Sequence, residues 1–351
     1  MDRVILKAGE LDGYLTADDR KNLKSLELLF GKALKIFPKL QAGKKGAESG
    51  LIKLYDEMET LTQDICRKES RIHIYSFIAS REDHSEVSRL IAKLRGVDTQ
   101  NMEFIYYIQR AYEMLFKLVW GSAQDSQENY LFVKTPVASP AQNYAVHRIT
   151  NIDNKIDNAV MCVMLRGALL PSMIISKEIE EYSSRGYVTP FALFKICRND
   201  KRRENNMEYI LELDKSFFDP EALNGKDLIF ADPMNATGGS LVAVVKYILG
   251  SGIKPRSIVF LNVISALKGA LRAARALENC DVYTLWMDAA LNRDAYILPG
   301  LGDAGDRING KDSGENPRNI IQLLADYGTS MANLYRSQFR EIENTVLGGK
   351  R

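Results

Sequence analysis

The chain has few of the residues that build metal sites, disulfide frameworks or histidine-dependent active sites. Its 351 residues include four cysteines, at positions 66, 162, 197 and 280, and no Cys-x-x-Cys pair. This scattered spacing supports neither a zinc site nor a disulfide framework, and a reducing cytoplasm is the simplest setting. His73, His84 and His147 form no His-x-x-x-His or His-Glu-x-x-His pattern. We therefore expect no protein-bound metal and no Ser-His-Asp triad.

Long apolar runs and an excess of charge of one sign are also missing. No window approaches the roughly 18 apolar residues of a membrane span, and no signal-peptide stretch begins the chain. We therefore expect a cytoplasmic protein that does not bind membranes. The 47 Lys+Arg against 45 Asp+Glu leave a formal net charge of +2, which argues against a nucleic-acid partner. The absence of a Gly-x-x-x-x-Gly-Lys-Ser/Thr loop disfavours a P-loop kinase.

The composition is that of a globular protein, and the spacing of apolar residues predicts helices in the first third of the chain. With 46% apolar and 26% charged residues, the composition is ordinary, and the length predicts about two domains. Apolar residues recur at helical spacing after a capping Thr16, again over residues 51–65, and again over residues 101–120. The polar stretch 121–129 is typical of a linker between domains.

Beyond the linker, short apolar runs rich in β-branched residues alternate with helical patterns. The runs span residues 159–165, 191–196, 228–231, 257–263 and 282–286. Continuous apolar strands separated by helices indicate a parallel sheet covered on both faces. Ligands of such sheets bind beyond the carboxyl ends of the strands, so the chemistry is expected in the loops that follow them.

The segment 228–240 indicates a phosphate site in one of these loops. A buried strand ends at Asp232, and a turn of small residues then opens a helix near Ser240. Gly238 and Gly239 let backbone N–H groups approach an anion, and the helix directs the positive end of its dipole at the same place. The alternative is an ordinary strand-to-helix turn, which the Thr237-Gly-Gly sequence alone does not exclude.

Two segments together resemble one enzyme family. Residues 228–240 resemble the signature of the phosphoribosyltransferases, and their Asp-Pro-Met and Ala-Thr-Gly-Gly-Ser sequences are similar to the uracil-specific branch. Residues 288–307, with three glycines within six residues, resemble the segment that binds uracil in uracil phosphoribosyltransferases. An alternating backbone edge in such a loop can read the donor and two acceptors of uracil without a charged side chain. The resemblance covers roughly residues 130–310.

The resemblance implies roles for individual residues. Arg166 and Arg198 are expected to bind the leaving pyrophosphate, although the loop at Arg166-Gly167 inverts the family's Ala-Gly order. Binding of phosphoribosyl pyrophosphate falls to these two arginines and to Asp232, Asn235, Ala236, Thr237, Gly238, Gly239 and Ser240. Binding of uracil falls to Tyr296, Ile297, Gly302, Asp303 and Ala304. Catalysis is assigned to Asp303, Arg166 and Arg198, with Asp303 assisting removal of the N1 proton as a hypothesis.

The resemblance also implies a fold and a domain order. We expect an α/β protein whose parallel-sheet phosphoribosyltransferase fold carries a β-rich hood for the base. An all-α N-terminal domain of unknown role is expected over residues 1–125, the phosphoribosyltransferase domain over 126–314 and a C-terminal helical extension over 315–351. Residues 317–347 have the pattern of one amphipathic helix. That helix is expected to pack on the N-terminal helices or on a neighbouring subunit.

The implied activity is transfer of ribose 5-phosphate from phosphoribosyl pyrophosphate to uracil, giving UMP and pyrophosphate, as in pyrimidine salvage. The resemblance implies an oxocarbenium-like transition state, Mg²⁺ carried by the substrate and a homodimer or larger homo-oligomer. Two alternatives remain open: a non-catalytic regulatory protein that binds uracil or phosphoribosyl pyrophosphate, and a transferase for another pyrimidine. The helical third is expected to mediate oligomerisation or contact with a partner.

Overall fold

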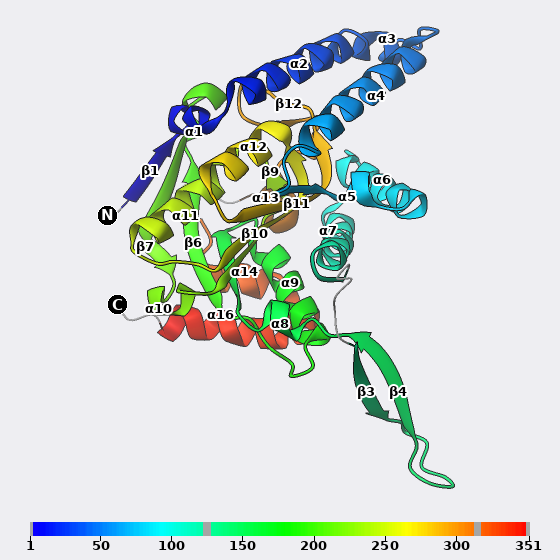
Figure 1. The fold of residues 1–351 in the computed structure, drawn as a ribbon, viewed down its shortest axis with the longest axis vertical. Coiled ribbons are helices and arrows are strands. Elements are labelled where there is room, and N and C mark those ends of the chain that lie inside the picture. The colour runs from blue at the N-terminus through cyan, green and yellow to red at the C-terminus, as the bar shows by residue number, and fades with distance from the viewer. Residues whose placement is uncertain (1–2, 122–127, 312–316, 349–351) are drawn as a thin grey trace.

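A mixed β-sheet forms the centre of the protein. A computed structural model of the chain describes residues 3–121, 128–311 and 317–348 (Figure 1). The strands of the sheet are β1 (Arg3–Lys7), β2 (Ile72–Ile74), β5 (Ala159–Leu165), β6 (Phe191–Arg198), β7 (Glu208–Phe217), β8 (Asp227–Ala231), β9 (Met234–Asn235), β10 (Ser257–Ala266) and β11 (Cys280–Asp288). They follow the order β1-β7-β6-β5-β8-β10-β11-β2, with β9 paired to β10. Neighbouring strands are parallel except β7, which runs antiparallel to β6 and β1.

The central strands are apolar along their length because helices cover both faces of the sheet. All five residues of β8 are buried, as are six of the seven residues of β5. On one face α11 (Gly239–Gly250) and α12 (Leu267–Ala276) pack together, and on the other α7 (Asn101–Phe116) and α9 (Leu169–Tyr182) do the same (Figure 1). The parallel strands predicted from the apolar runs are confirmed. Their bounds differ from the predicted ones by no more than a few residues at each end.

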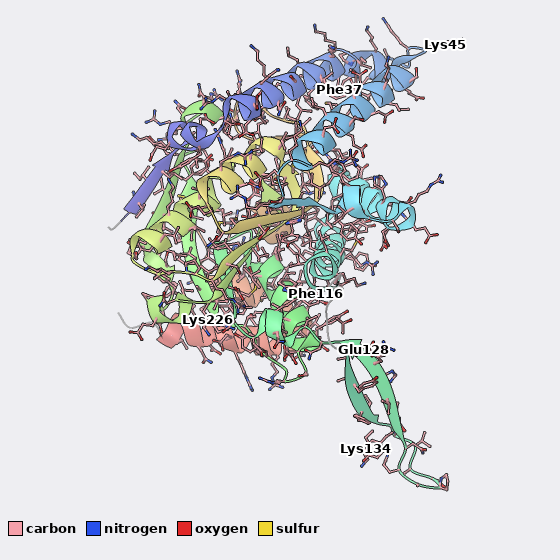
Figure 2. The ribbon with its side chains drawn as sticks, viewed as in Figure 1. Phe37, Lys45, Phe116, Glu128, Lys134 and Lys226 are labelled. Atoms are coloured by element: carbon pink, nitrogen blue, oxygen red, sulfur yellow. The ribbon has the colours of Figure 1, made fainter. Side chains whose placement is uncertain are left out.

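The helical character of the first third is also confirmed. Thr16 caps α2 through paired bonds with Asp19, each 3.0 Å long, in which each backbone N–H donates to the other side chain. Helices α2 and α4 pack against each other as a helical hairpin that extends from the body, with Lys45 near its tip (Figure 2). The helices of this region are α1 (Ala8–Tyr14), α2 (Ala17–Leu34), α3 (Phe37–Gln41), α4 (Ala47–Cys66), α5 (Tyr75–Ile78), α6 (Arg81–Arg95) and α7.

The expectation of an all-α first third is incomplete, because both edge strands of the sheet come from it. Strand β1 pairs with β7 from Arg3 opposite Glu212 to Lys7 opposite Glu208, and β2 pairs with β11. Such short strands carry too few residues for their alternation to be recognised in the sequence. The N-terminal region is therefore built into the sheet. The predicted boundary between residues 125 and 126 lies outside the described residues.

A hairpin of β3 (Glu128–Lys134) and β4 (Tyr144–Thr150) extends from the body at the opposite end (Figure 2). Glu128 pairs with Thr150 and Lys134 with Tyr144 along its whole length. Its large apolar side chains are open to solvent, with Phe132 72% exposed. The hairpin includes the last two residues of the predicted linker 121–129, because β3 begins at Glu128, and residues 122–127 lie outside the described residues.

The C-terminal segment differs from the predicted single helix. It consists of α14 (Ile320–Asp326), α15 (Gly328–Leu334) and α16 (Arg336–Gly348), and the breaks between these helices fall at Tyr327 and Tyr335. Helix α16 packs on α9 and β6, where Gln338 donates a 2.7 Å hydrogen bond to Glu180. Helices α14 and α15 line a cavity of about 470 Å³ together with the start of α7. The predicted boundary between residues 314 and 315 lies outside the described residues.

Besides the π-helical turn Lys117–Gly121 and the 3-10 turn Glu204–Asn206, the described residues form three further short α-helices. They are α8 (Asp153–Ile156), α10 (Pro220–Leu223) and α13 (Ala304–Asn309). Across residues 3–121, 128–311 and 317–348, no helix combines the length and apolar character that crossing a bilayer requires.

Candidate active site

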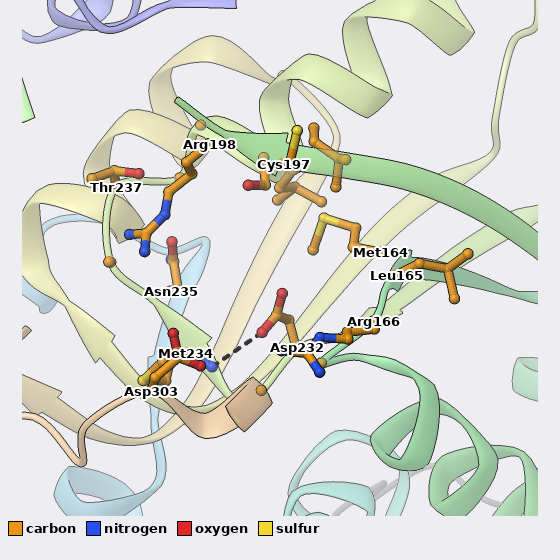
Figure 3. A pocket seen from close by; sticks show the side chains of 18 of the residues that line it. Met164, Leu165, Arg166, Cys197, Arg198, Asp232, Met234, Asn235, Thr237 and Asp303 are labelled. Atoms are coloured by element: carbon orange, nitrogen blue, oxygen red, sulfur yellow. Dashed lines mark hydrogen bonds between the residues drawn. The ribbon is translucent and has the colours of Figure 1, made fainter. Parts of the chain in front are cut away.

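The carboxyl ends of three parallel strands bring the predicted polar residues together. Arg166 follows β5, Arg198 ends β6 and Asp232 follows β8. Because these strands are parallel neighbours, their ends meet at one edge of the sheet. The three side chains line a single cavity of about 330 Å³ (Figure 3). Strand β5 lies between β6 and β8, so the cavity opens where the strand order reverses, the usual position of a ligand in such sheets.

The predicted phosphate loop forms one wall of this cavity. Its residues, all of which line the cavity, are Asn235, Ala236, Thr237, Gly238, Gly239 and Ser240. Gly238 is the N-cap of α11 and has a φ of 71°. A Cβ atom there would lie 2.7 Å from the carbonyl oxygen of Gly269 in α12, so the conformation and the space both require glycine. The loop thus presents the N-terminal amides of a twelve-residue helix to the cavity.

Tyr209 of β7 contacts this loop at Thr237 and Gly239. It was not identified from the sequence. Its hydroxyl donates a 2.6 Å hydrogen bond to Oγ1 of Thr237, and the side chain is fully buried. Its ring also fills the space where a side chain at Gly239 would begin. No local motif marks Tyr209, because it acts on a loop 28 residues away.

Asp232 lies on the cavity floor, where its carboxylate accepts a 3.3 Å hydrogen bond from the backbone N–H of Met234 (Figure 3). Burial raises the pKa of Asp232 to about 7. The negative charge of Asp303 raises this pKa further, whereas the Met234 N–H and the Arg198 guanidinium oppose the shift. A carboxyl group at this position therefore keeps its proton to a higher pH than an exposed aspartate does.

The two arginines reach the segment that follows β11. Arg166 donates to Oδ1 of Asp306 at 2.5 Å and to the carbonyl oxygen of Gly310 at 2.7 Å. Arg198 donates to the carbonyl oxygen of Ala295 at 3.5 Å, and its guanidinium carbon lies 5.6 Å from the centre of the Tyr296 ring. Asp306, Lys195 and Cys197 also line the cavity, although the sequence assigned them no role.

The predicted uracil segment is a small β-structure followed by α13. Strands β12 (Ala290–Leu291) and β13 (Ile297–Leu298) pair with each other. Asp303 caps α13 by accepting a 2.9 Å hydrogen bond from the N–H of Asp306, and it lines the cavity. The cavity lining does not include Tyr296, Ile297, Gly302 or Ala304. Tyr296 is 42% exposed, whereas Ile297 and Ala304 are buried. The structure therefore brings one of the five predicted uracil residues to the cavity.

The N-terminal region anchors this segment. Arg95 of α6 forms an ion pair with Asp288 at 2.7 Å and donates to the carbonyl oxygen of Gly300 at 3.1 Å. The same Asp288 accepts a 2.9 Å hydrogen bond from the N–H of Gly300. These contacts hold the turn that precedes Gly302.

The cavity holds several carboxylates but no preformed metal cage. Asp232, Asp303 and Asp306 line it. In the part of the chain that the structure describes, no three His, Cys, Asp or Glu side chains are grouped closely enough to hold a metal ion.

Comparison with known proteins identifies the family. A family model described as uracil phosphoribosyltransferase matches residues 185–310. A uracil phosphoribosyltransferase of Dictyoglomus turgidum is 41% identical over 228 residues, which cover 65% of this chain and 97% of that protein. The chain belongs to the uracil phosphoribosyltransferase family. A second relative of that name, from Ureaplasma urealyticum, is 28% identical over the same share of each chain. Uracil phosphoribosyltransferases are pentosyltransferases, so this is a family of enzymes.

Solved structures with weaker likeness were also found. A protein from Aquifex aeolicus is 22% identical, with a TM-score of 0.47, over 68% of this chain and 98% of that one. The orotate phosphoribosyltransferase of Mycobacterium tuberculosis, solved with phosphoribosyl pyrophosphate, is 13% identical, with a TM-score of 0.31, over 61% and 95%. Family membership, the mixed sheet with its parallel strands and the helical N-terminal region together confirm the predicted fold class.

The first prediction concerns the contact between Gly239 and Tyr209. Replacing Gly239 with Ala should lower the free energy of unfolding by about 1–3 kcal/mol, because the new Cβ overlaps the buried ring. Gly250 at the other end of α11 is the matched control, since no atom lies within 4 Å of its Cβ position. Urea denaturation of G239A and G250A measures the difference. Equal unfolding free energies would contradict the steric argument.

The second prediction concerns the pH dependence of stability at Asp232. The folded protein holds the Asp232 proton up to a pKa of about 7, whereas the ordinary pKa of an aspartate side chain is 3.8. The unfolding free energy therefore falls as pH rises between these values. Replacement of Asp232 with Asn removes this dependence, so D232N should match the wild type below pH 4 and exceed its stability by up to about 4 kcal/mol above pH 7. Urea denaturation across this range tests it, and a constant difference would refute it.

Proposed function

We propose that the protein transfers ribose 5-phosphate from phosphoribosyl pyrophosphate to N1 of uracil, releasing UMP and pyrophosphate. The observation that supports this best is the single cavity lined by all nine residues predicted to bind phosphoribosyl pyrophosphate. Membership of the uracil phosphoribosyltransferase family supports the choice of base. A role in pyrimidine salvage, in the cytoplasm and as a homo-oligomer, is part of the proposal.

In the proposed mechanism the chain positions the ribose and stabilises the negative charge of the leaving pyrophosphate. The amides and hydroxyls of residues 236–240 hold the 5-phosphate, and Asp232 accepts hydrogen bonds from the ribose hydroxyls. The bond between the anomeric carbon and pyrophosphate breaks through an oxocarbenium-like transition state. Arg166 and Arg198 stabilise the negative charge that builds on the leaving group. Arg166 must exchange its contact with Asp306 for this role, so Asp306 competes with pyrophosphate for the guanidinium.

Uracil would be read by the segment that follows β11. The backbones of Ile297 and Gly302 are assigned to the base, Tyr296 and Asp303 lie toward the ribose, and Ala304 completes the set. The contact of Arg198 with Tyr296 and the presence of Asp303 in the cavity support this placement, since both join the base segment to the phosphoribosyl site. Contact with the base through Ile297 and Gly302 requires the segment to open toward the cavity, because the present lining leaves both out.

Mg²⁺ would enter with the substrate. Its preference for phosphate oxygens and water over a full set of protein ligands suits the cavity, where separated carboxylates line the space around the expected pyrophosphate. Asp232 and Asp303 are the side chains that would contact the hydrated ion. The ion would neutralise charge on the pyrophosphate.

An assay of pyrophosphate release from phosphoribosyl pyrophosphate tests the proposed function. Release that depends on added uracil, with UMP as the second product, is expected. Faster pyrophosphate release with another pyrimidine than with uracil would show that the other pyrimidine is the substrate. Tight binding of phosphoribosyl pyrophosphate without release would instead favour the non-catalytic regulatory protein, which the existing Arg166–Asp306 pair makes worth testing.

The role of Asp303 in proton removal is tested by Asp303→Asn. The amide retains an oxygen that can cap α13, so the fold should survive while the charge is lost. If Asp303 assists removal of the N1 proton, kcat should fall about a hundredfold with the KM for phosphoribosyl pyrophosphate unchanged. Full turnover by D303N with normal uracil binding would remove this role.

A further inference from the structure

A cluster of four charged side chains lies beneath the phosphate loop and joins it to the N-terminal region. Arg272 of α12 is fully buried and contacts Asp12 of α1 at 2.6 Å and Glu204 at 3.1 Å. Lys268, one turn earlier in α12, contacts the same Glu204 at 2.9 Å and Asp12 at 3.9 Å. The cluster holds two positive and two negative charges, so the buried Arg272 and the partly exposed Lys268 each have a counter-charge.

Arg272 also reaches the phosphate loop. Its Nη1 donates a 3.4 Å hydrogen bond to the carbonyl oxygen of Thr237, the residue that precedes the two glycines of the loop. The hydroxyl of Thr237 is held from another side by Tyr209. Both the backbone and the side chain of Thr237 are therefore fixed by residues that do not themselves line the cavity.

The first strand and helix of the chain hold both of these supports in place. In β1, Leu6 pairs with Tyr209 of β7, and the N–H of Ala8 donates to the carbonyl oxygen of Met207 at 2.9 Å. In α1, Asp12 accepts from Nε of Arg272 at 3.0 Å and from its Nη2 at 2.6 Å. A guanidinium without access to water needs this carboxylate to stay at its position.

We propose that Asp12 is a positioning residue for the phosphate loop, acting through Arg272 on the carbonyl group of Thr237. By fixing Arg272, it presets the loop amides and hydroxyls for the 5-phosphate of the substrate. The choice of the 5-phosphate as the ligand of the loop rests on the proposed function. The coupling between Asp12 and the loop does not depend on that function. The N-terminal segment is thereby part of the phosphate-binding machinery.

A second ion pair of the same kind provides a matched control. Asp19 of α2 pairs with Arg275 of α12 at 2.9 Å and 3.1 Å, again joining the N-terminal region to this helix. Arg275 lies one turn beyond Arg272, and it also pairs with Glu69, which is not part of the loop. A purely structural role for these pairs predicts the same consequences for Asp12→Asn and Asp19→Asn.

The experiment compares D12N and D19N in the full-length protein by two measurements. The first is amide hydrogen exchange of residues 235–240 without ligand. The second is calorimetric binding of ribose 5-phosphate, a probe that requires the phosphate loop but neither uracil nor catalysis. We expect D12N alone to accelerate exchange in the loop and to raise the Kd of ribose 5-phosphate about tenfold. In turnover, D12N should raise the KM for phosphoribosyl pyrophosphate more than it lowers kcat.

A double mutant tests whether the effect passes through Arg272. In an Arg272→Met background, D12N should cause no further change in loop exchange or in ribose 5-phosphate affinity. Additive losses would contradict transmission through Arg272. Equal effects of D12N and D19N on the loop, or no effect of either, would also overturn the proposal.

The outcomes separate this proposal from the proposed function. A wild-type protein that binds ribose 5-phosphate, loses affinity in D12N and transfers no base would support the coupling and overturn only the uracil transferase activity. A wild-type protein that binds no ribose 5-phosphate would overturn both the phosphate role of the loop and the role of Asp12.

Discussion

The close packing of the phosphate loop on α12 is the constraint on which the site depends. A Cβ on Gly238 would meet the carbonyl oxygen of Gly269 at 2.7 Å, and a Cβ on Gly269 would meet Oδ1 of Asn235 at the same distance. Neither residue has room for a side chain, so backbone lies directly against backbone. This contact fixes the position of the loop against α12. It also places Arg272, the next residue on that face of α12, under Thr237.

Much of the site could be predicted from the sequence because its residues follow strands that are easy to recognise. The runs that became β5 and β8 are apolar throughout, that of β6 is apolar except for Lys195, and parallel strands bring their carboxyl ends to one edge. Arg166, Arg198 and Asp232 therefore converge as expected. Thr237 and its neighbours were found because glycine and hydroxyl residues in that order suit an anion.

The remainder could not be predicted because it depends on contacts between distant parts of the chain. Asp12 and Arg272 are separated by 260 positions, and neither belongs to a recognisable motif. Tyr209 resembles any other buried residue of a strand until Thr237 is placed beside it. In the base segment the sequence identified a loop that can approach a ligand. Whether Ile297 and Gly302 face the cavity depends on how Arg95 and Asp288 hold the turn, which no spacing rule describes.

The pairing of β1 with β7 also has a consequence for biosynthesis. The partner of strand β1 is made about two hundred residues after it, as the contact between Arg3 and Glu212 shows. During translation β1 leaves the ribosome long before it can join the sheet. Asp12 can pair with Arg272 only later still, because 260 positions separate the two residues. Contacts of such large sequence separation slow folding. The phosphate site therefore matures only after most of the chain has been synthesised, so nascent chains that end before α12 lack the complete site.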